Sequence, residues 1–260
     1  MMFDAAAIAR VERSAAAQAE LSARALPAPA ASVARFGDGV LVAMGPRRYV
    51  NRAVGITLRE LTDPDLDEVE SFFAQAGVPA AVELSSFAPA QTVAQLSQRG
   101  YRLDWFRSVF ATPRTSGDSS PTGLRIVEVA GSDVPAWLDV LAIGNGATTT
   151  EQRAVSDEFA LATRGLPDTT NYLAFDGDVA VGCGTVQLID GVAWLGGAAT
   201  LPQHRGRGVQ RALLHARRET AARTGATMVA ASALTNGASA RNLQRAGLHH
   251  VFTQAVVSRP

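Results

Sequence analysis

Apolar residues near the start of the chain recur at helical spacing. Phe3, Ile8, Val11 and Ala15 fall on one stripe, and charged residues lie between them. Such a stripe predicts an amphipathic helix that packs one face on a core. The segment 26–32, LPAPAAS, ends this helix, because proline has no amide proton with which to continue it.

Short apolar runs separated by polar turns fill the rest of the first half. They predict strands at 39–44, 53–59 and 80–84, a strand or a hairpin at 101–111, and helices at 65–76 and 92–99. The segment 112–123, TPRTSGDSSPTG, has the composition of a linker. We therefore place a domain boundary there and expect one domain at 1–113 and a second at 124–260.

The pattern after residue 124 predicts a mixed sheet. Strands are expected at 124–129, 172–175, 179–189, 192–200, 228–231 and 249–257, and helices at 133–143, 156–163, 209–224 and 239–246. Asp176-Gly177 predicts a hairpin turn, and Ser132 is the expected N-cap of the first of these helices. Hairpins first and a strand–helix–strand unit later are typical of an α/β domain.

The two halves are similar at an offset of 147 residues. Segment 82–101 aligns without a gap on 229–248, with the identical pairs Val82/Val229, Ser85/Ser232, Leu96/Leu243 and Gly100/Gly247. Four identities in this segment are compatible both with chance and with a duplicated fold.

The composition of the chain argues against several kinds of partner and site. The net charge is +0, so we expect neither nucleic acid nor a membrane surface as a partner. Charged residues interrupt the N-terminal apolar stretch and no run suits a membrane span, so we expect a cytoplasmic protein. The single cysteine, Cys183, excludes an intrachain disulfide, and the histidines lack ligand spacing with carboxylates, so no metal is expected.

The stretch 200–214, TLPQHRGRGVQRALL, carries the clearest candidate chemistry. A strand leads into a loop with Gly206 and Gly208, and an amphipathic helix follows at once. The first N–H groups of a helix are unpaired and carry a partial positive charge, which suits a phosphate. Glycines let the backbone approach it, and Arg205 and Arg207 add charge. The segment therefore predicts a diphosphate-binding loop.

Other phosphate loops do not fit. A Walker A loop needs a lysine, and all 24 basic side chains of the chain are arginine. In the two G-x-G segments that begin at Gly206 and Gly182, Arg211 and Gln187 occupy the place of the third glycine of a dinucleotide-binding loop. A G-x-S-x-G nucleophile elbow is also absent from the sequence.

These residues resemble the GNAT superfamily of acyl-CoA-dependent N-acyltransferases. Its signature, Q/R-x-x-G-x-G/A at a strand-to-helix turn, is matched by Gln203-x-x-Gly206-x-Gly208. The family's second landmark is an Asn-x-x-Ala/Ser segment that opens a later helix, which ends in a glycine followed by an apolar residue. It is matched by Asn236, Ser239, Asn242, Gly247 and Leu248. Over 124–258 the resemblance implies a GNAT-like mixed sheet flanked by helices. The first half resembles only the back part of such a fold and has Pro89 in the place of Asn236, which implies a tandem protein with a degenerate, GNAT-like N-terminal half.

The resemblance also implies acetyl-CoA as co-substrate. Strand segment 196–200 would splay from 228–231, and the pantetheine arm would lie in that gap. The amine acceptor would enter near the helices at 133–143 and 156–163. The residues implied to bind CoA are Ala198, Thr200, Arg205, Gly206, Arg207, Gly208, Val209, Gln210, Asn236, Ser239 and Asn242.

The leading interpretation is an N-acetyltransferase that moves an acetyl or other acyl group to an amine of a small molecule or peptide by direct attack. The proton-donating tyrosine common in relatives would stand seven residues after Asn236, where this chain has Leu243. Glu151 and Glu158 are candidates for a catalytic base, with solvated surface charge as the alternative. An acyl-CoA sensor without turnover is a second functional interpretation, and a structural or partner-binding role for the N-terminal half alone is a third. A monomer or a homodimer fits each of them.

Overall fold

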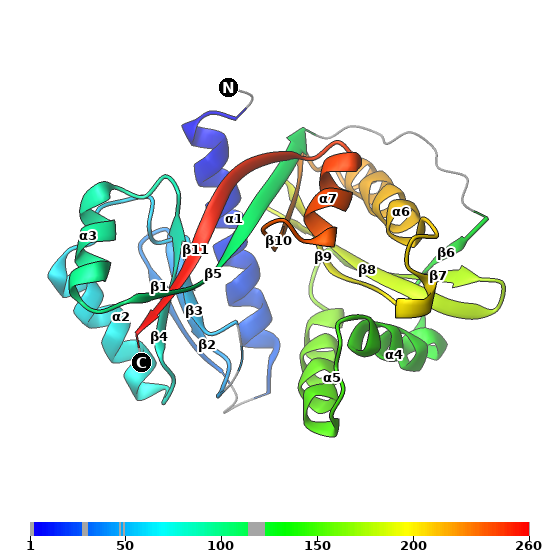
Figure 1. Ribbon diagram of the computed structural model, residues 1–260, viewed down its shortest axis with the longest axis horizontal. Helices are drawn as coiled ribbons and strands as arrows, with labels where there is room; N and C mark the ends of the chain where they lie inside the picture. Colours follow the sequence, from blue (N-terminus) through cyan, green and yellow to red (C-terminus); the bar gives the residue numbers. More distant parts are fainter. Residues whose placement is uncertain (1–2, 28–30, 47, 49, 114–122, 260) are drawn as a thin grey trace. The chain divides into compact units, whose positions relative to one another are not determined.

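The computed structural model describes residues 3–27, 31–46, 48, 50–113 and 123–259 (Figure 1). These residues form two compact units. The first consists of Met1–Val109, Ala233–Gly237 and His250–Pro260, and the second of Phe110–Ser232 and Ala238–His249. The units interleave along the chain, because its final strand belongs to the first unit. The domain division at 1–113 and 124–260 stays a prediction, and most of the expected linker lies outside the described residues.

The first unit is built on a mixed sheet. Its strand order is β1-β2-β3-β4-β11-β5. Strands β3 and β4 pair in parallel, whereas β1/β2, β2/β3 and β4/β11 are antiparallel. Val82 in β4 lies opposite Ala53 and Val257, which fixes the register on both of its edges. The strands are β1 (Ser32–Phe36), β2 (Gly39–Ala43), β3 (Arg52–Val54), β4 (Ala80–Ser85), β5 (Arg102–Pro113) and β11 (His249–Arg259).

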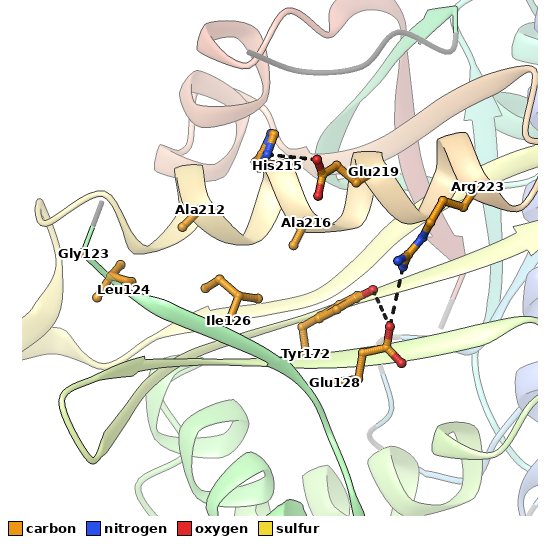
Figure 2. A pocket seen from close by; sticks show the side chains of 10 residues that line it. All are labelled: Gly123, Leu124, Ile126, Glu128, Tyr172, Ala212, His215, Ala216, Glu219 and Arg223. Atoms are coloured by element: carbon orange, nitrogen blue, oxygen red, sulfur yellow. Dashed lines mark hydrogen bonds and ion pairs between the residues drawn. The ribbon is translucent and has the colours of Figure 1, made fainter. Parts of the chain in front are cut away.

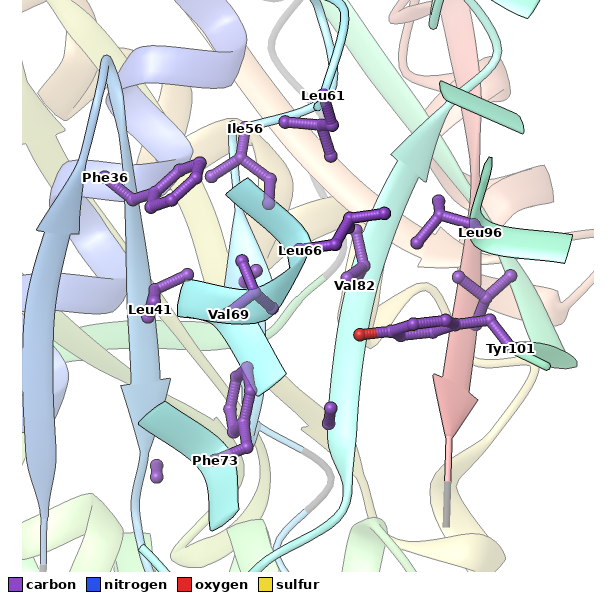
Figure 3. Packing of buried hydrophobic residues seen from close by; sticks show 14 of the residues in the cluster. Phe36, Leu41, Ile56, Leu61, Leu66, Val69, Phe73, Val82, Leu96 and Tyr101 are labelled. Carbon is purple, nitrogen blue, oxygen red and sulfur yellow. The ribbon is translucent and has the colours of Figure 1, made fainter. Parts of the chain in front are cut away.

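Three helices, α1 (Ala5–Ala25), α2 (Asp63–Gln75) and α3 (Ala90–Gln98), belong to this unit. The spacing of three and four residues puts Leu66, Val69 and Phe73 on one face of α2. All three are fully buried in the cluster of Figure 3, which also holds Leu41 and Val82 from the sheet. This apolar packing holds α2 to the strands.

In the second unit the strands follow the order β10-β9-β8-β7-β6. Strands β9 and β10 are parallel, and the other neighbours are antiparallel. The sheet therefore starts as a meander and adds β10 by a crossover through a helix. Its strands are β6 (Arg125–Glu128), β7 (Thr169–Asp176), β8 (Val179–Ile189), β9 (Val192–Thr200) and β10 (Met228–Leu234).

Helices cover the strands of this second unit. Helices α4 (Val134–Gly144) and α5 (Thr150–Arg164) pack with Leu173, Cys183 and Ala199 of the strands. Helix α6 (Val209–Arg223) covers the opposite face, towards which the Cβ position of Gly182 points. A side chain at Gly182 would collide with Val209 and Leu213, so the small residue allows α6 to pack closely. Helix α7 (Ala238–Arg245) follows β10.

The expected α/β fold class, with a mixed sheet flanked by helices, is confirmed. The strand predicted at 192–200 is β9, and the helix predicted at 209–224 is α6 with one residue fewer. The strand expected at 53–59 ends at Val54, because Gly55 adopts a φ of 73°. Ser132 is not an N-cap: it lies in a 3-10 turn, Gly131–Asp133, where the Asp133 carboxylate accepts the N–H of Ala130.

None of the helices in the part of the chain that the structure describes combines the length and apolar character needed to cross a bilayer.

Candidate functional site

The turn between β9 and α6 is built on two glycines with left-handed backbone. Gly206 has a φ of 79° and Gly208 a φ of 81°, which residues with a Cβ rarely adopt. Gly208 is the N-cap of α6, and no described side chain caps the helix there. The first turn holds no acidic residue either. The N-terminal N–H groups and their partial positive charge are therefore available to an anion.

Helix α2 of the first unit has a different N-terminus. The Thr62 hydroxyl accepts the N–H of Asp65 at 3.4 Å, and the Asp65 carboxylate accepts the N–H of Thr62 at 2.7 Å. Asp63 adds a further carboxylate to this turn, and Arg59 pairs with Asp65 at 2.8 Å. The N-terminus of α2 is thus occupied by its own carboxylates, which would repel a phosphate.

Two arginines lie beside the glycine turn of the second unit. Arg205 donates through Nε to the carbonyl of Thr200 at 3.4 Å and through Nη2 to the carbonyl of Gly144 at 3.2 Å. Arg207 lies 3.5 Å from the Asp176 carboxylate and is 61% exposed. Both side chains reach solvent, so the turn is flanked by positive charge. Val209, the first residue of the helix, is buried.

Strands β9 and β10 pair over only part of their length. Their parallel ladder runs from Val192 opposite Met228 to Leu195 opposite Ala231 and ends there. On its other edge, β9 shifts register against β8, and Gly197 adopts a φ of 53°. The strands therefore separate after Leu195, as the resemblance implies.

A cavity of about 150 Å³ lies at this separation, wholly within the second unit. Residues from β9, β10, α6 and α7 line it. Among them is Leu243, and none is a carboxylate, a histidine or a tyrosine. The lining residues are Leu195, Gly196, Gly197, Ala198, Gln210, Leu214, Arg217, Ala231, Ser232, Ser239, Asn242 and Leu243.

Four of the residues expected to bind CoA line this cavity: Ala198, Gln210, Ser239 and Asn242. Gln210 Nε2 donates to the carbonyl of Ala199 and to the hydroxyl of Thr200, both at 2.9 Å. This pair of bonds fastens the end of β9 to the first turn of α6. The cavity and the glycine turn are thereby held next to each other.

Three further candidates from the sequence, Asn236, Glu151 and Glu158, do not line the cavity beside β9. Asn236 is exposed in a loop of the first unit, has a φ of 61° and is not among the lining residues. Glu151 and Glu158 are on α5 and do not line the cavity either. Glu151 is exposed, and hydrogen bonds from its own N–H and from Thr149 lower its pKa.

Arg217 was not among the residues expected from the sequence, but it lines the cavity and is only 1% exposed. Its Nε donates to Leu213 O at 3.1 Å, and its Nη1 lies 3.3 Å from Gly196 O and 3.5 Å from Thr185 O. Burial lowers the pKa of Arg217 to about 10, so the side chain is protonated at neutral pH. The available signal was Gly184, where an added Cβ would lie 2.8 Å from the guanidinium carbon.

A second hollow, of about 470 Å³, lies between α6 and strands β6 and β7 (Figure 2). Tyr172 Oη lies 2.6 Å from the Thr220 hydroxyl and donates to Glu128 at 3.3 Å, and Arg223 lies 3.6 Å from the same carboxylate. Burial raises the pKa of Tyr172. Tyr172 lines this hollow and not the cavity beside β9.

Residues 140–248 match the model of the "Acetyltransferase (GNAT) family". A solved GCN5-related N-acetyltransferase from Kribbella flavida is similar over 97% of this chain and 95% of its own, with a TM-score of 0.68 and 19% identity. A tandem GNAT protein from the clavulanic acid biosynthesis pathway is similar over 96% and 93%, with a TM-score of 0.63 and 12% identity. A search of curated proteins gives no match.

Proposed function

Residues 140–248 match the model of the acetyltransferase (GNAT) family, and from this premise we propose that the chain transfers an acyl group from acyl-CoA to an amine. The acceptor is an amine of a small molecule or peptide, and acetyl-CoA is the simplest donor. The second unit carries the activity, and the first unit is a related half that has lost its CoA site.

One observation carries this proposal: the cavity beside β9 is tied to a helix N-terminus that no side chain in the described part of the chain caps. A CoA thioester needs both features, because its diphosphate is anionic and its pantetheine arm is a narrow chain. The glycine turn offers N–H groups to the diphosphate, with Arg205, Gly206, Arg207, Gly208 and Val209 around it. Ala198, Thr200, Gln210, Ser239 and Asn242 lie along the cavity or at its edge.

The reaction proposed is a direct displacement. The nitrogen of a neutral amine attacks the thioester carbonyl carbon, a C–N bond forms and the C–S bond breaks. The amine loses one proton and CoA leaves as a thiolate that gains one. Orientation of the two reactants is the main contribution expected of the protein, because no acid or base side chain lines the cavity.

That lining also supports the alternative function, an acyl-CoA sensor without turnover. Leu243 has no proton to give to a departing thiolate. General acid–base help is typically worth about 10²–10⁴-fold, so an enzyme of this design is expected to be slow. Release of free thiol in the presence of a panel of amines separates the two functions, since only an enzyme produces it.

Binding of CoA is tested with two matched glycine variants. Gly206 (φ 79°) and Gly225 (φ 78°) have the same backbone conformation, and a Cβ at either meets open space. Ala at each position therefore adds a similar backbone strain, about 1–2 kcal/mol. We expect Gly206→Ala to weaken CoA binding about tenfold, equivalent to ~1.4 kcal/mol, and Gly225→Ala to leave it within about twofold, since only Gly206 lies in the turn.

Thermal shift and calorimetry with CoA measure both variants and the wild type. Equal affinities in the three folded proteins would contradict the assignment of the glycine turn to the diphosphate. A wild-type protein that shows neither a thermal shift nor heat of binding with CoA would refute the proposed function.

A further inference from the structure

We propose that the inner end of the cavity beside β9 binds a carboxylate, so that the preferred donor is an acyl-CoA whose acyl chain itself ends in a carboxylate. Malonyl-CoA and succinyl-CoA belong to this class. The inference rests on the proposed function, because it names the acyl group for the same site.

Arg217 is a charged residue that lies almost wholly inside the protein. Arginine is almost never fully buried unless its charge is paired, and a buried ion loses hydration that an opposite charge must replace. Arg217 is 1% exposed, yet no described carboxylate lies within ion-pair distance of it. The titratable groups that act on its pKa are Cys183 and Tyr172, and both are neutral at ordinary pH. The second unit thus holds a buried cation whose counter-charge is not among its described residues.

The place of Arg217 along the cavity indicates which part of the ligand it meets. Gln210, Leu214 and Arg217 line the cavity from successive turns of α6. At a rise of 1.5 Å per residue, Arg217 lies about 10 Å deeper than Gln210 along the helix. Gln210 stands beside the glycine turn, where the diphosphate is proposed to bind. The pantetheine arm therefore runs towards Arg217, and the acyl group lies at the Arg217 end.

The guanidinium has capacity left for a ligand. Nε and Nη1 donate to backbone carbonyls of Leu213, Thr185 and Gly196, whereas Nη2 has no hydrogen-bond partner among the described residues. A planar guanidinium matches the geometry of a carboxylate better than other cations do. The neighbouring walls include Leu214 and Leu243. An ion pair between apolar walls is screened less than one in water.

Two other roles for Arg217 predict different behaviour. If it only supports the carbonyls of β8 and β9, acyl chains with and without a carboxylate will bind alike. If it stabilises the departing thiolate, which every acyl-CoA shares, its loss will slow transfer from all donors equally. A carboxylate site instead distinguishes between donors of similar size.

The experiment measures affinities of the wild-type protein for matched thioesters without an acceptor amine. Succinyl-CoA is compared with butyryl-CoA, malonyl-CoA with propionyl-CoA, and free CoA serves as the reference. We expect at least one carboxylated member to bind about tenfold or more tightly than its neutral partner. Equal affinities within both pairs overturn the inference but leave the proposed function intact, provided that CoA binds. Absence of CoA binding overturns both.

Two arginine variants follow. Arg217→Met keeps the length of the side chain and removes its charge, and we expect it to abolish the preference for the carboxylated over the neutral thioester. Arg218→Met is the control, because Arg218 also donates to a backbone carbonyl, that of Ala246, but does not line the cavity. It should retain the preference. A preference that survives in folded Arg217→Met contradicts the assignment, and if that variant does not fold the wild-type panel still decides.

Discussion

Glu12 on α1 offers a sharp test of the packing in the first unit. Its side chain is buried, and Gln254 Nε2 donates to both carboxylate oxygens at 3.3 and 3.1 Å. Burial, with the nearby charge of Glu83, raises the pKa of Glu12 from 4.5 to about 7, although Gln254, Ser85 and Arg107 act in the opposite direction. Replacement of Glu12 by glutamine removes the titration and keeps an amide of similar shape.

The effect of Glu12 on the free energy of unfolding follows from the difference between its pKa in the folded and in the unfolded chain. Below pH 4.5 the carboxyl is protonated in both folded and unfolded chains, and its titration costs nothing. Between pH 4.5 and 7 the unfolded chain loses the proton first, so stability falls as the pH rises. Each pKa unit is worth about 1.36 kcal/mol, and the full shift therefore costs the fold about 3 kcal/mol above pH 8. Glu12→Gln should recover most of this, because the buried Gln254 Oε1 has no partner among the described residues and can accept from the new amide.

Urea unfolding of the full chain at several pH values measures the difference. We expect Glu12→Gln to be more stable than the wild type by about 2–3 kcal/mol at pH 8 and by about 1 kcal/mol or less at pH 5. The control is Glu20→Gln on the same helix. Burial there acts to raise the pKa, but hydrogen bonds from Arg24 and Arg35 outweigh it and lower the pKa of Glu20. Its loss should reduce stability at pH 8. A difference between wild type and Glu12→Gln that does not vary with pH would refute the reasoning.

Two further predictions concern the site. Calorimetry should give one CoA per chain, because the N-terminus of α2 is capped by its own carboxylates, and two equivalent sites would contradict this. Tyr172→Phe and Tyr101→Phe should each keep kcat within about threefold, far below the ~10²-fold loss of a general acid, because neither residue lines the cavity beside β9. A hundredfold drop with intact CoA binding would show that one of them supplies the proton.

The elements that sequence analysis located best are those with a long apolar period or a specific glycine. Strand β9 has the predicted bounds, and the left-handed φ of Gly206 and Gly208 explains why the turn needs glycine. Both features are local, so the chain itself encodes them within a few residues. The short edge strand β1, Ser32–Phe36, was missed: it follows prolines and only Phe36 in it is buried.

Non-local features could not be predicted in the same way. Arg217 lies between Ala216 and Arg218 in the sequence. Leu213, Leu214 and Ala221 are three or four residues away, so helical spacing places Arg217 on the buried face of α6, but it does not show what surrounds a charged side chain there. Its burial results from contact with Gly184 and Gly196, which are distant in sequence. Likewise, the pairing of β11 with β4 in the first unit depends on strands that lie far apart along the chain.

The repeat at an offset of 147 residues is also visible in the positions of the helices and strands. Strands β4 and β5 and helices α2 and α3 begin within one residue of 147 positions before β10, β11, α6 and α7. This agreement favours a duplicated fold over chance as the origin of the similarity between 82–101 and 229–248. Corresponding positions can then be compared directly.

Both ends of the proposed ligand site are closed in the first half. At the entrance, Asp63 and Asp65 occupy the start of α2, where α6 has only glycine before its first turn. At the inner end, the position of Arg217 corresponds to Glu70, whose carboxylate lies 2.6 Å from Arg259 and 3.4 Å from Arg99. In the first half, side chains of the protein itself thus supply the negative charge at both positions. In the second half, we propose that the ligand supplies it. A CoA thioester with a terminal carboxylate carries negative charge at the two places where the second half lacks it.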